Sequence, residues 1–238
     1  MVRGPAAVLG LLAVAQAYFL VAPELPAITP EDLSIFIACG CGLAAVMVCV
    51  VAVVPLTDVP PLAVLVAIGA FLLVAGLNAA DVGAAATPVE AIAYAAGGGL
   101  FAVALLAPSL ALALPVFVGA VDAVSTLAGG LSEMLAEAGR TQPGDPLSLE
   151  LPDWGNGLPA GRLGVSDAVF AGVFLVFARR FGLRPVATAV GLWAAMVAAV
   201  ALKVWLDRTI PVLPLMAAAY FLVNADRLPA LVRAASRG

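Results

Sequence analysis

Residues 34–55 read SIFIACGCGLAAVMVCVVAVVP, a run of apolar and small residues without one charged side chain. A helix rises ~1.5 Å per residue, so this run is long enough to cross the ~30 Å hydrocarbon core of a membrane. On either side of it, similar runs predict further spans at about 5–22, 61–78, 89–107, 109–130, 163–178, 185–203 and 210–224. The sequence therefore predicts an all-α, polytopic membrane helical bundle of about eight helices, in which short loops make neighbours antiparallel.

The composition supports this class of protein. Hydrophobic residues make up 64% of the chain and charged residues 11%, against ~25% charged residues in soluble domains. The net charge is −4 and the lysines and arginines are scattered, which argues against nucleic-acid binding. Histidine is absent, so Ser–His and Cys–His nucleophile pairs and HExxH zinc sites are excluded. Cys39, Cys41 and Cys49 fall inside one apolar run, where we expect them to pack as small residues.

One long polar segment interrupts the apolar runs. Residues 131–162 hold prolines, glycines and seven charged residues: Glu133, Glu137, Arg140, Asp145, Glu150, Asp153 and Arg162. We expect a short amphipathic helix over 131–139 and a polar loop for the rest. The chain then divides into helices within 1–130, the hydrophilic loop at 131–162, and helices within 163–238, without a separate soluble domain.

Two carboxyl groups lie inside predicted spans. Asp122 occurs in VGAVDAVS and Asp167 in LGVSDAVF. An acid within a span costs ~3 kcal/mol on insertion scales, so it usually has a function, although a structural hydrogen bond to a neighbouring helix is the alternative. Asp122 is roughly 12 Å and Asp167 roughly 6 Å from the face that carries the loop. Both acids are therefore predicted on one side of the membrane, where they could meet.

The start of the last span reaches the same face. Residues 210–215 read IPVLPL. Proline has no N–H and disfavours helix in the residue before it, so some backbone is left unpaired, which a membrane tolerates only where it is buried or lines a cavity. Such backbone could pair with an extended substrate. The alternative is a helix that simply begins at proline.

Two neighbouring carboxyl groups in a medium of low dielectric constant predict one kind of chemistry. They cannot both ionise and therefore share a proton. The ionised member can take a proton from water while its partner protonates the carbonyl oxygen or the leaving amine. This is aspartyl peptide hydrolysis, and it needs neither a metal nor a histidine.

The residues around these acids resemble the presenilin and signal peptide peptidase family of intramembrane aspartyl proteases, most closely its archaeal and bacterial presenilin-like members. The family has a Tyr-Asp motif, a Gly-x-Gly-Asp motif and a Pro-Ala-Leu motif. In this chain the corresponding residues are Val121-Asp122, Gly164-Val165-Ser166-Asp167 and Pro211-Val212-Leu213. The resemblance covers roughly residues 109–224, and Val121, Ser166 and Val212 depart from the family pattern.

The resemblance implies a presenilin-like bundle of eight or nine helices in a prokaryotic cell membrane. It implies catalysis by Asp122 and Asp167 without a cofactor. It also implies two partners, namely membrane lipid and a transmembrane protein or peptide substrate, and the substrate is positioned by the residues Pro211, Val212, Leu213, Gly164 and Ser166.

Other functions remain open at this point. A prepilin-type peptidase also uses Gly-x-Gly-Asp, but its second motif continues with Val/Ile-Lys, whereas Ala168-Val169 follows here. A proton-coupled transporter could relay protons through the two acids, although no inverted repeat is visible. A catalytically inactive relative that binds substrate is a further alternative. A third acid, Asp81, is predicted in a loop, and the Ser125 and Ser166 hydroxyls are expected to bond their own backbone.

Overall fold

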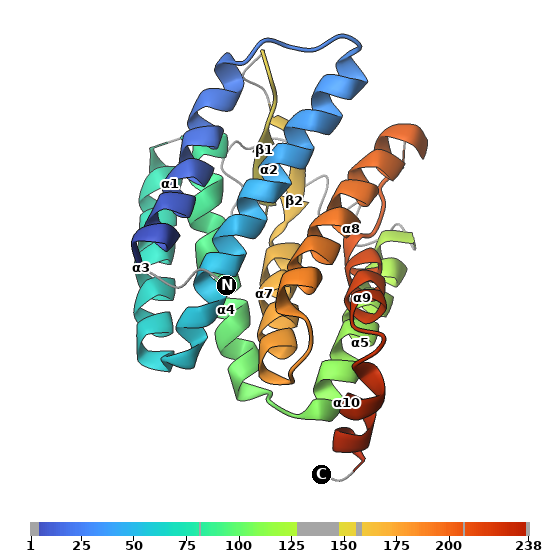
Figure 1. The fold of residues 1–238 in the computed structure, drawn as a ribbon. Helices are drawn as coiled ribbons and strands as arrows, with labels where there is room; N and C mark the ends of the chain where they lie inside the picture. Colours follow the sequence, from blue (N-terminus) through green and yellow to red (C-terminus); the bar gives the residue numbers. More distant parts are fainter. Residues whose placement is uncertain (1–4, 81, 128–147, 156–158, 207, 237–238) are drawn as a thin grey trace. The chain divides into compact units, whose positions relative to one another are not determined.

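The computed structural model describes residues 5–80, 82–127, 148–155, 159–206 and 208–236. The chain forms two compact units (Figure 1). The first unit comprises described residues within 1–100 and 143–172, and the second comprises described residues within 101–142 and 173–238. Helices α4 and α7 contribute residues to both.

Helices dominate both units. The first unit contains α1 (Pro5–Val21), α2 (Glu31–Val53), α3 (Pro60–Ala79), most of α4 (Thr87–Ala104), the strands β1 (Ser148–Pro152) and β2 (Pro159–Gly164), and the start of α7 (Val165–Arg180), with short 3-10 turns at Ala22–Glu24, Val54–Asp58 and Gly83–Ala86. The second unit contains α5 (Pro108–Leu127), α8 (Pro185–Leu206), α9 (Val212–Val223) and α10 (Leu228–Ala235). Four of these helices begin with a proline, whose missing N–H would have no partner in a first turn anyway.

The chain is a multi-pass membrane protein by the length and apolarity of its helices. Five described stretches can cross a membrane: Glu31–Asp58, Pro60–Ala79, Gly83–Ala104, Pro108–Leu127 and Pro185–Leu206. A sixth is α9 with α10, if this pair, bent by 100°, is one broken span. Among the described residues each predicted apolar run contains a helix, but α1 and α7 have only 17 and 16 residues. The count of eight spans therefore stays a prediction.

The polar loop predicted over 140–162 was wrong at residues 148–152 and 159–162, which form strands. β1 and β2 pair antiparallel, with Glu150 opposite Arg162. Leu149, Leu151 and Leu163 are buried, and the ladder packs on α2. Glu150 and Arg162, two of the seven charged residues that predicted a polar loop, form an ion pair at 3.0 Å. The helices are consistent with the predicted all-α helical bundle, to which this two-stranded ladder is an addition, and α7 begins only after β2 ends. The amphipathic helix predicted at 131–139 lies outside the described residues.

Glycines bring α4 and α7 into backbone contact within the first unit. A Cβ atom on Gly98 would lie 2.2 Å from the carbonyl oxygen of Val169, and one on Gly172 would lie 2.7 Å from that of Ala95. Real Cβ atoms essentially never come this close. Small residues at helix interfaces permit such approach in membranes. Gly98 therefore permits the close packing of α4 on α7, and the contact fixes α7 at Val169, two residues after Asp167.

In the second unit, α9 packs between α5 and α8 (Figure 1). The buried Asn224 closes the end of α9. Its amide nitrogen donates to Thr188 Oγ1 on α8 at 2.9 Å, and its oxygen accepts from the Arg184 backbone N–H at 2.8 Å. A buried amide with its hydrogen bonds satisfied specifies one arrangement of the two helices.

One buried hydroxyl on α9 predicts a gain in stability. Tyr220 is fully buried beside Phe174, and its hydroxyl has no hydrogen-bond partner among the described residues. We expect Tyr220→Phe to raise the free energy of unfolding by about 1 kcal/mol, because it removes an unsatisfied buried group. The measurement is thermal unfolding in detergent.

The matched control is Tyr18→Phe. The Tyr18 hydroxyl donates to the Ala38 carbonyl at 2.8 Å and accepts from Trp154 Nε1 at 3.3 Å. This variant should lose about 1 kcal/mol of stability, because it removes both hydrogen bonds and leaves Trp154 Nε1 without its partner. Equal destabilisation by the two substitutions would contradict the prediction for Tyr220.

Candidate active site

Asp122 on α5 holds the first turn of α9. Its Oδ2 accepts a hydrogen bond from the Leu213 backbone N–H at 3.0 Å. The Val212 N–H and the Thr126 side chain also hydrogen-bond this carboxyl group. The cap residue Pro211 makes no side-chain cap of its own. Asp122 therefore caps a helix that follows it by about 90 residues, and the positive end of the helix dipole faces its carboxylate.

The Pro-Val-Leu-Pro segment explains which amides α9 offers. Pro211 has an extended conformation (φ −66°, ψ 126°) and the helix begins at Val212. Because Pro211 and Pro214 have no N–H, Val212 and Leu213 carry the only two amides of the segment. Both donate to Asp122. The helix thus begins directly after a proline, and its first amides are left for the acid rather than for a side chain of α9.

A glycine on α5 permits this contact. A Cβ on Gly119, one turn before Asp122, would lie 3.2 Å from the Pro214 Cα atom and 3.6 Å from the Ala217 Cβ atom. Such a separation is tighter than most real contacts, so a side chain here would push α9 away. The Ser125 hydroxyl donates to the backbone carbonyl of Asp122 at 3.1 Å, as predicted for a serine in a membrane helix.

Asp167 belongs to the first unit and is the third residue of α7. It is buried, with 6% of its surface exposed. A Cβ on Gly164, the last residue of β2, would lie 3.3 Å from both Asp167 Oδ2 and Ser166 Oγ. The carboxyl group is therefore folded back over the strand–helix junction, where the first turn of α7 favours negative charge. Any side chain at position 164 would crowd the Asp167 carboxyl group. Ser166, the residue before Asp167, is exposed.

The predicted site residues thus fall into two groups. Asp122 lies together with Pro211, Val212 and Leu213 in the second unit, whereas Gly164, Ser166 and Asp167 lie together in the first. The pairing of the two carboxyl groups stays a prediction. Asp81 lies outside the described residues. Among the described residues, no group of three or more Cys, Asp and Glu side chains is arranged to hold a metal ion.

Sequence reasoning missed the strand ladder that leads into Asp167. β2 runs directly into α7, so the register of the ladder determines which residue of β1 lies opposite the strand–helix junction before Asp167. Ser148 lies opposite Gly164 in this register. The available signal was the Leu149-Glu150-Leu151 alternation, which is typical of a strand but is short and sits among prolines and charges.

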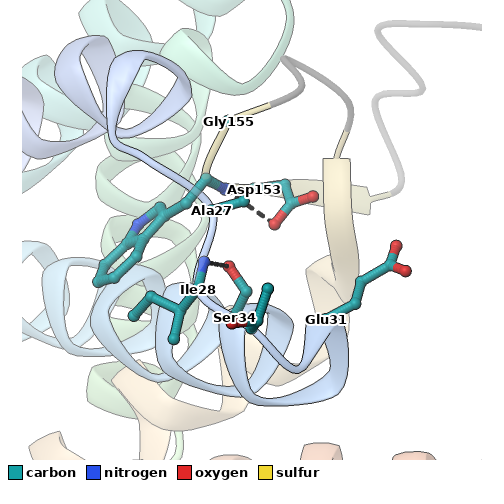
Figure 2. Close-up of a pocket in the computed structure, with 8 residues that line it drawn as sticks. Ala27, Ile28, Glu31, Ser34, Asp153 and Gly155 are labelled. Atoms are coloured by element: carbon teal, nitrogen blue, oxygen red, sulfur yellow. Dashed lines mark hydrogen bonds between the residues drawn. The ribbon is translucent and has the colours of Figure 1, made fainter.

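A separate cavity of about 240 Å³ lies in the first unit, between the α1–α2 connection and the end of β1 (Figure 2). Its lining includes Glu31 and the buried Asp153. Ser34 Oγ accepts from the Ile28 backbone N–H at 3.2 Å, and Asp153 Oδ1 accepts from the Trp154 backbone N–H at 2.8 Å. These bonds order the connection, and none of the motif residues takes part in them.

Comparisons with family models, curated proteins and solved structures gave no match. The likeness to the presenilin family therefore rests on the three short motifs and their spacing.

Proposed function

We propose that the chain is an intramembrane aspartyl protease of a prokaryotic cell membrane, which hydrolyses peptide bonds of transmembrane segments with Asp122, Asp167 and one water molecule. The contact between Asp122 and the amide of Leu213 carries this proposal. It joins two of the three motifs across 91 positions of the chain. Both acids are withdrawn from bulk solvent, Asp167 by burial and Asp122 in part, as an acid–base pair requires.

In the proposed reaction, the water oxygen bonds to the carbonyl carbon of the substrate while its proton passes to the ionised carboxylate. The partner acid then protonates the amide nitrogen as the C–N bond breaks. The hydrogen bonds to Asp122 fix the orientation of one carboxyl group before substrate arrives, and preorganised polar groups are a large source of catalysis. No cofactor is needed.

A peptide bond must leave the helical form before water can attack it. β2 leads straight into Asp167, and extended peptides bind by adding to a strand edge. We propose that the substrate is held extended along this strand and against Pro211, Val212 and Leu213. Gly164 keeps the junction narrow, and the exposed Ser166 hydroxyl can bond the substrate backbone.

The same contact also favours a second candidate, an inactive relative. A carboxylate that caps α9 is what a purely structural acid would do. The two candidates differ in what they require of the side chain. A cap needs a hydrogen-bond acceptor, whereas hydrolysis needs a group that takes up and gives back a proton.

The proposal is tested with purified protein and a labelled single-span peptide in detergent micelles. We expect cleavage within the apolar segment of the peptide, located by mass spectrometry. Absence of cleavage in micelles and in liposomes would overturn the proposal. Proton flux across liposomes without cleavage would favour the transporter.

Pairing of the two acids has its own test. The three native cysteines, Cys39, Cys41 and Cys49, are first replaced by alanine. The substitutions Asp122→Cys and Asp167→Cys then supply two thiols. One bridging water spans about 5.5 Å between two oxygens, so we expect a short bis-methanethiosulfonate reagent to link the two thiols. After cleavage at a protease site inserted within residues 131–147, the halves should stay joined until they are reduced.

The control for this test moves one cysteine to Val124. This residue lies about 200° around α5 from Asp122 and is 67% exposed. A pair of cysteines at Val124 and Asp167 should not link. Equal linking of both pairs, or none at Asp122 and Asp167, would contradict a shared site.

A further inference from the structure

A buried serine hydroxyl without a partner lies at the start of β1. Ser148 Oγ is shielded from solvent and makes no hydrogen bond to any described residue. Buried polar groups are nearly always hydrogen-bonded, and an unsatisfied one costs about 1–3 kcal/mol. A strand could begin with alanine or valine at no such cost, so the hydroxyl group needs an explanation.

The ladder register places this hydroxyl beside Asp167. Ser148 lies directly opposite Gly164, and opposite residues of an antiparallel pair direct their side chains to the same face, with Cβ atoms about 4.5–5.5 Å apart. The Cβ position of Gly164 is 3.3 Å from Asp167 Oδ2. Gly164 has no side chain to separate the two groups. The Ser148 hydroxyl and the Asp167 carboxyl group are therefore both placed next to Gly164, on the same face of the ladder at its end.

We infer that Ser148 is a positioning residue for hydrolysis, whose hydroxyl group holds the attacking water against Asp167. This inference rests on the proposed function. A serine hydroxyl both donates and accepts hydrogen bonds, so it can fix a water whose proton is directed at a carboxylate and whose lone pair faces the substrate carbonyl. Ser148 exchanges no proton: the water oxygen forms the new C–O bond, and the proton of the water passes to the ionised member of the acid pair.

Three substitutions at Ser148 separate the effect of the hydroxyl group from that of the shape of the side chain. Threonine and valine are nearly equal in shape and both favour strands, but only threonine carries a hydroxyl. We expect Ser148→Thr to keep kcat within about twofold of the wild type. Ser148→Val and Ser148→Ala should lower kcat by about tenfold, the value of one hydrogen bond, with KM unchanged because the substrate contacts remain.

Two controls accompany this series. Ser125→Ala removes a hydroxyl that bonds only a backbone carbonyl of its own helix among the described residues, and it should leave kcat unchanged. Thermal unfolding of the threonine and valine variants should agree, which excludes a difference in folding.

Equal kcat values for the valine and threonine variants, whether high or low, would overturn the role of the hydroxyl group. If the wild type cleaves the peptide and Asp122→Asn or Asp167→Asn abolishes cleavage, the proposed protease function stands even then. If the wild type does not cleave, or if these two variants do cleave, the protease function is contradicted, and the role of Ser148 with it.

Discussion

Asparagine at position 122 or 167 is expected to abolish peptide cleavage, with kcat lower by about 10⁴-fold in either variant. Each substitution removes one proton-transfer group and leaves the size and shape of the side chain almost unchanged. The measurement is the initial rate of cleavage of a single-span peptide by equal amounts of folded protein.

The structure makes Asp122→Asn a sharper test than Asp122→Ala. The asparagine side-chain oxygen can still accept the hydrogen bond that the Leu213 N–H gives to Asp122 Oδ2 at 3.0 Å. Asn is as good a helix cap as Asp, whereas alanine at a cap costs about 1 kcal/mol. We therefore expect Asp122→Ala to lose both activity and stability, and Asp122→Asn to lose activity alone.

A surface acid provides the control. Asp226 is exposed and forms an ion pair with Arg184 at 2.7 Å. Exposed ion pairs contribute little to the free energy of unfolding. Asp226→Asn should therefore cleave at the wild-type rate. Cleavage by Asp122→Asn or Asp167→Asn at a rate close to that of Asp226→Asn would leave the two acids with structural roles only.

The helices were predictable because apolar length is a local property. The run at 34–55 needs no partner to be recognised, and α2 spans Glu31–Val53. The β1–β2 ladder was not predictable in the same way. Its central charges, Glu150 and Arg162, are typical of a solvent-facing segment, and their ion pair at 3.0 Å offsets the cost of burying Glu150.

For the candidate site, the sequence singles out individual residues and does not predict their contacts. Counting helices predicts the membrane face on which Asp122 and residues 211–214 lie. It does not predict that the acid takes the amides of Val212 and Leu213, because a cap supplied from another helix depends on how closely the two helices pack. That packing depends on Gly119, whose missing side chain lets Pro214 approach. Ser148 was missed for a similar reason, since its place opposite Gly164 follows from strand register.

Two adjacent glycines of α4 are expected to respond to alanine with opposite signs. A Cβ on Gly97 would meet nothing within 4 Å, whereas one on Gly98 would lie 2.2 Å from the Val169 carbonyl oxygen. Alanine is a better helix former than glycine by ~1 kcal/mol, so Gly97→Ala should raise stability by up to about that amount. Gly98→Ala should lower stability by about 2 kcal/mol or more, because overpacking outweighs the gain in helix propensity.

The clash at Gly98 is between two backbones, so no side-chain rotation can relieve it. α4 and α7 must separate, and the strain falls at Val169, two residues after Asp167. Gly172→Ala, which would meet the Ala95 carbonyl oxygen at 2.7 Å, should show the same loss from the α7 side. The measurement is thermal unfolding in detergent, combined with the rate of cleavage.

Gly98→Ala and Asp122→Asn separate the positioning of an acid from its role in proton transfer. Gly98 carries no acid, but the clash at Val169 displaces α7, which holds Asp167. Gly98→Ala should therefore lower both the rate of cleavage and the stability, whereas Asp122→Asn should lower the rate of cleavage alone. Equal stability of the Gly97→Ala and Gly98→Ala variants would contradict the backbone contact between α4 and α7. A Gly98→Ala variant that is destabilised yet fully active would instead show that Asp167 keeps its place when α7 shifts, so that β2 rather than α4 positions the acid.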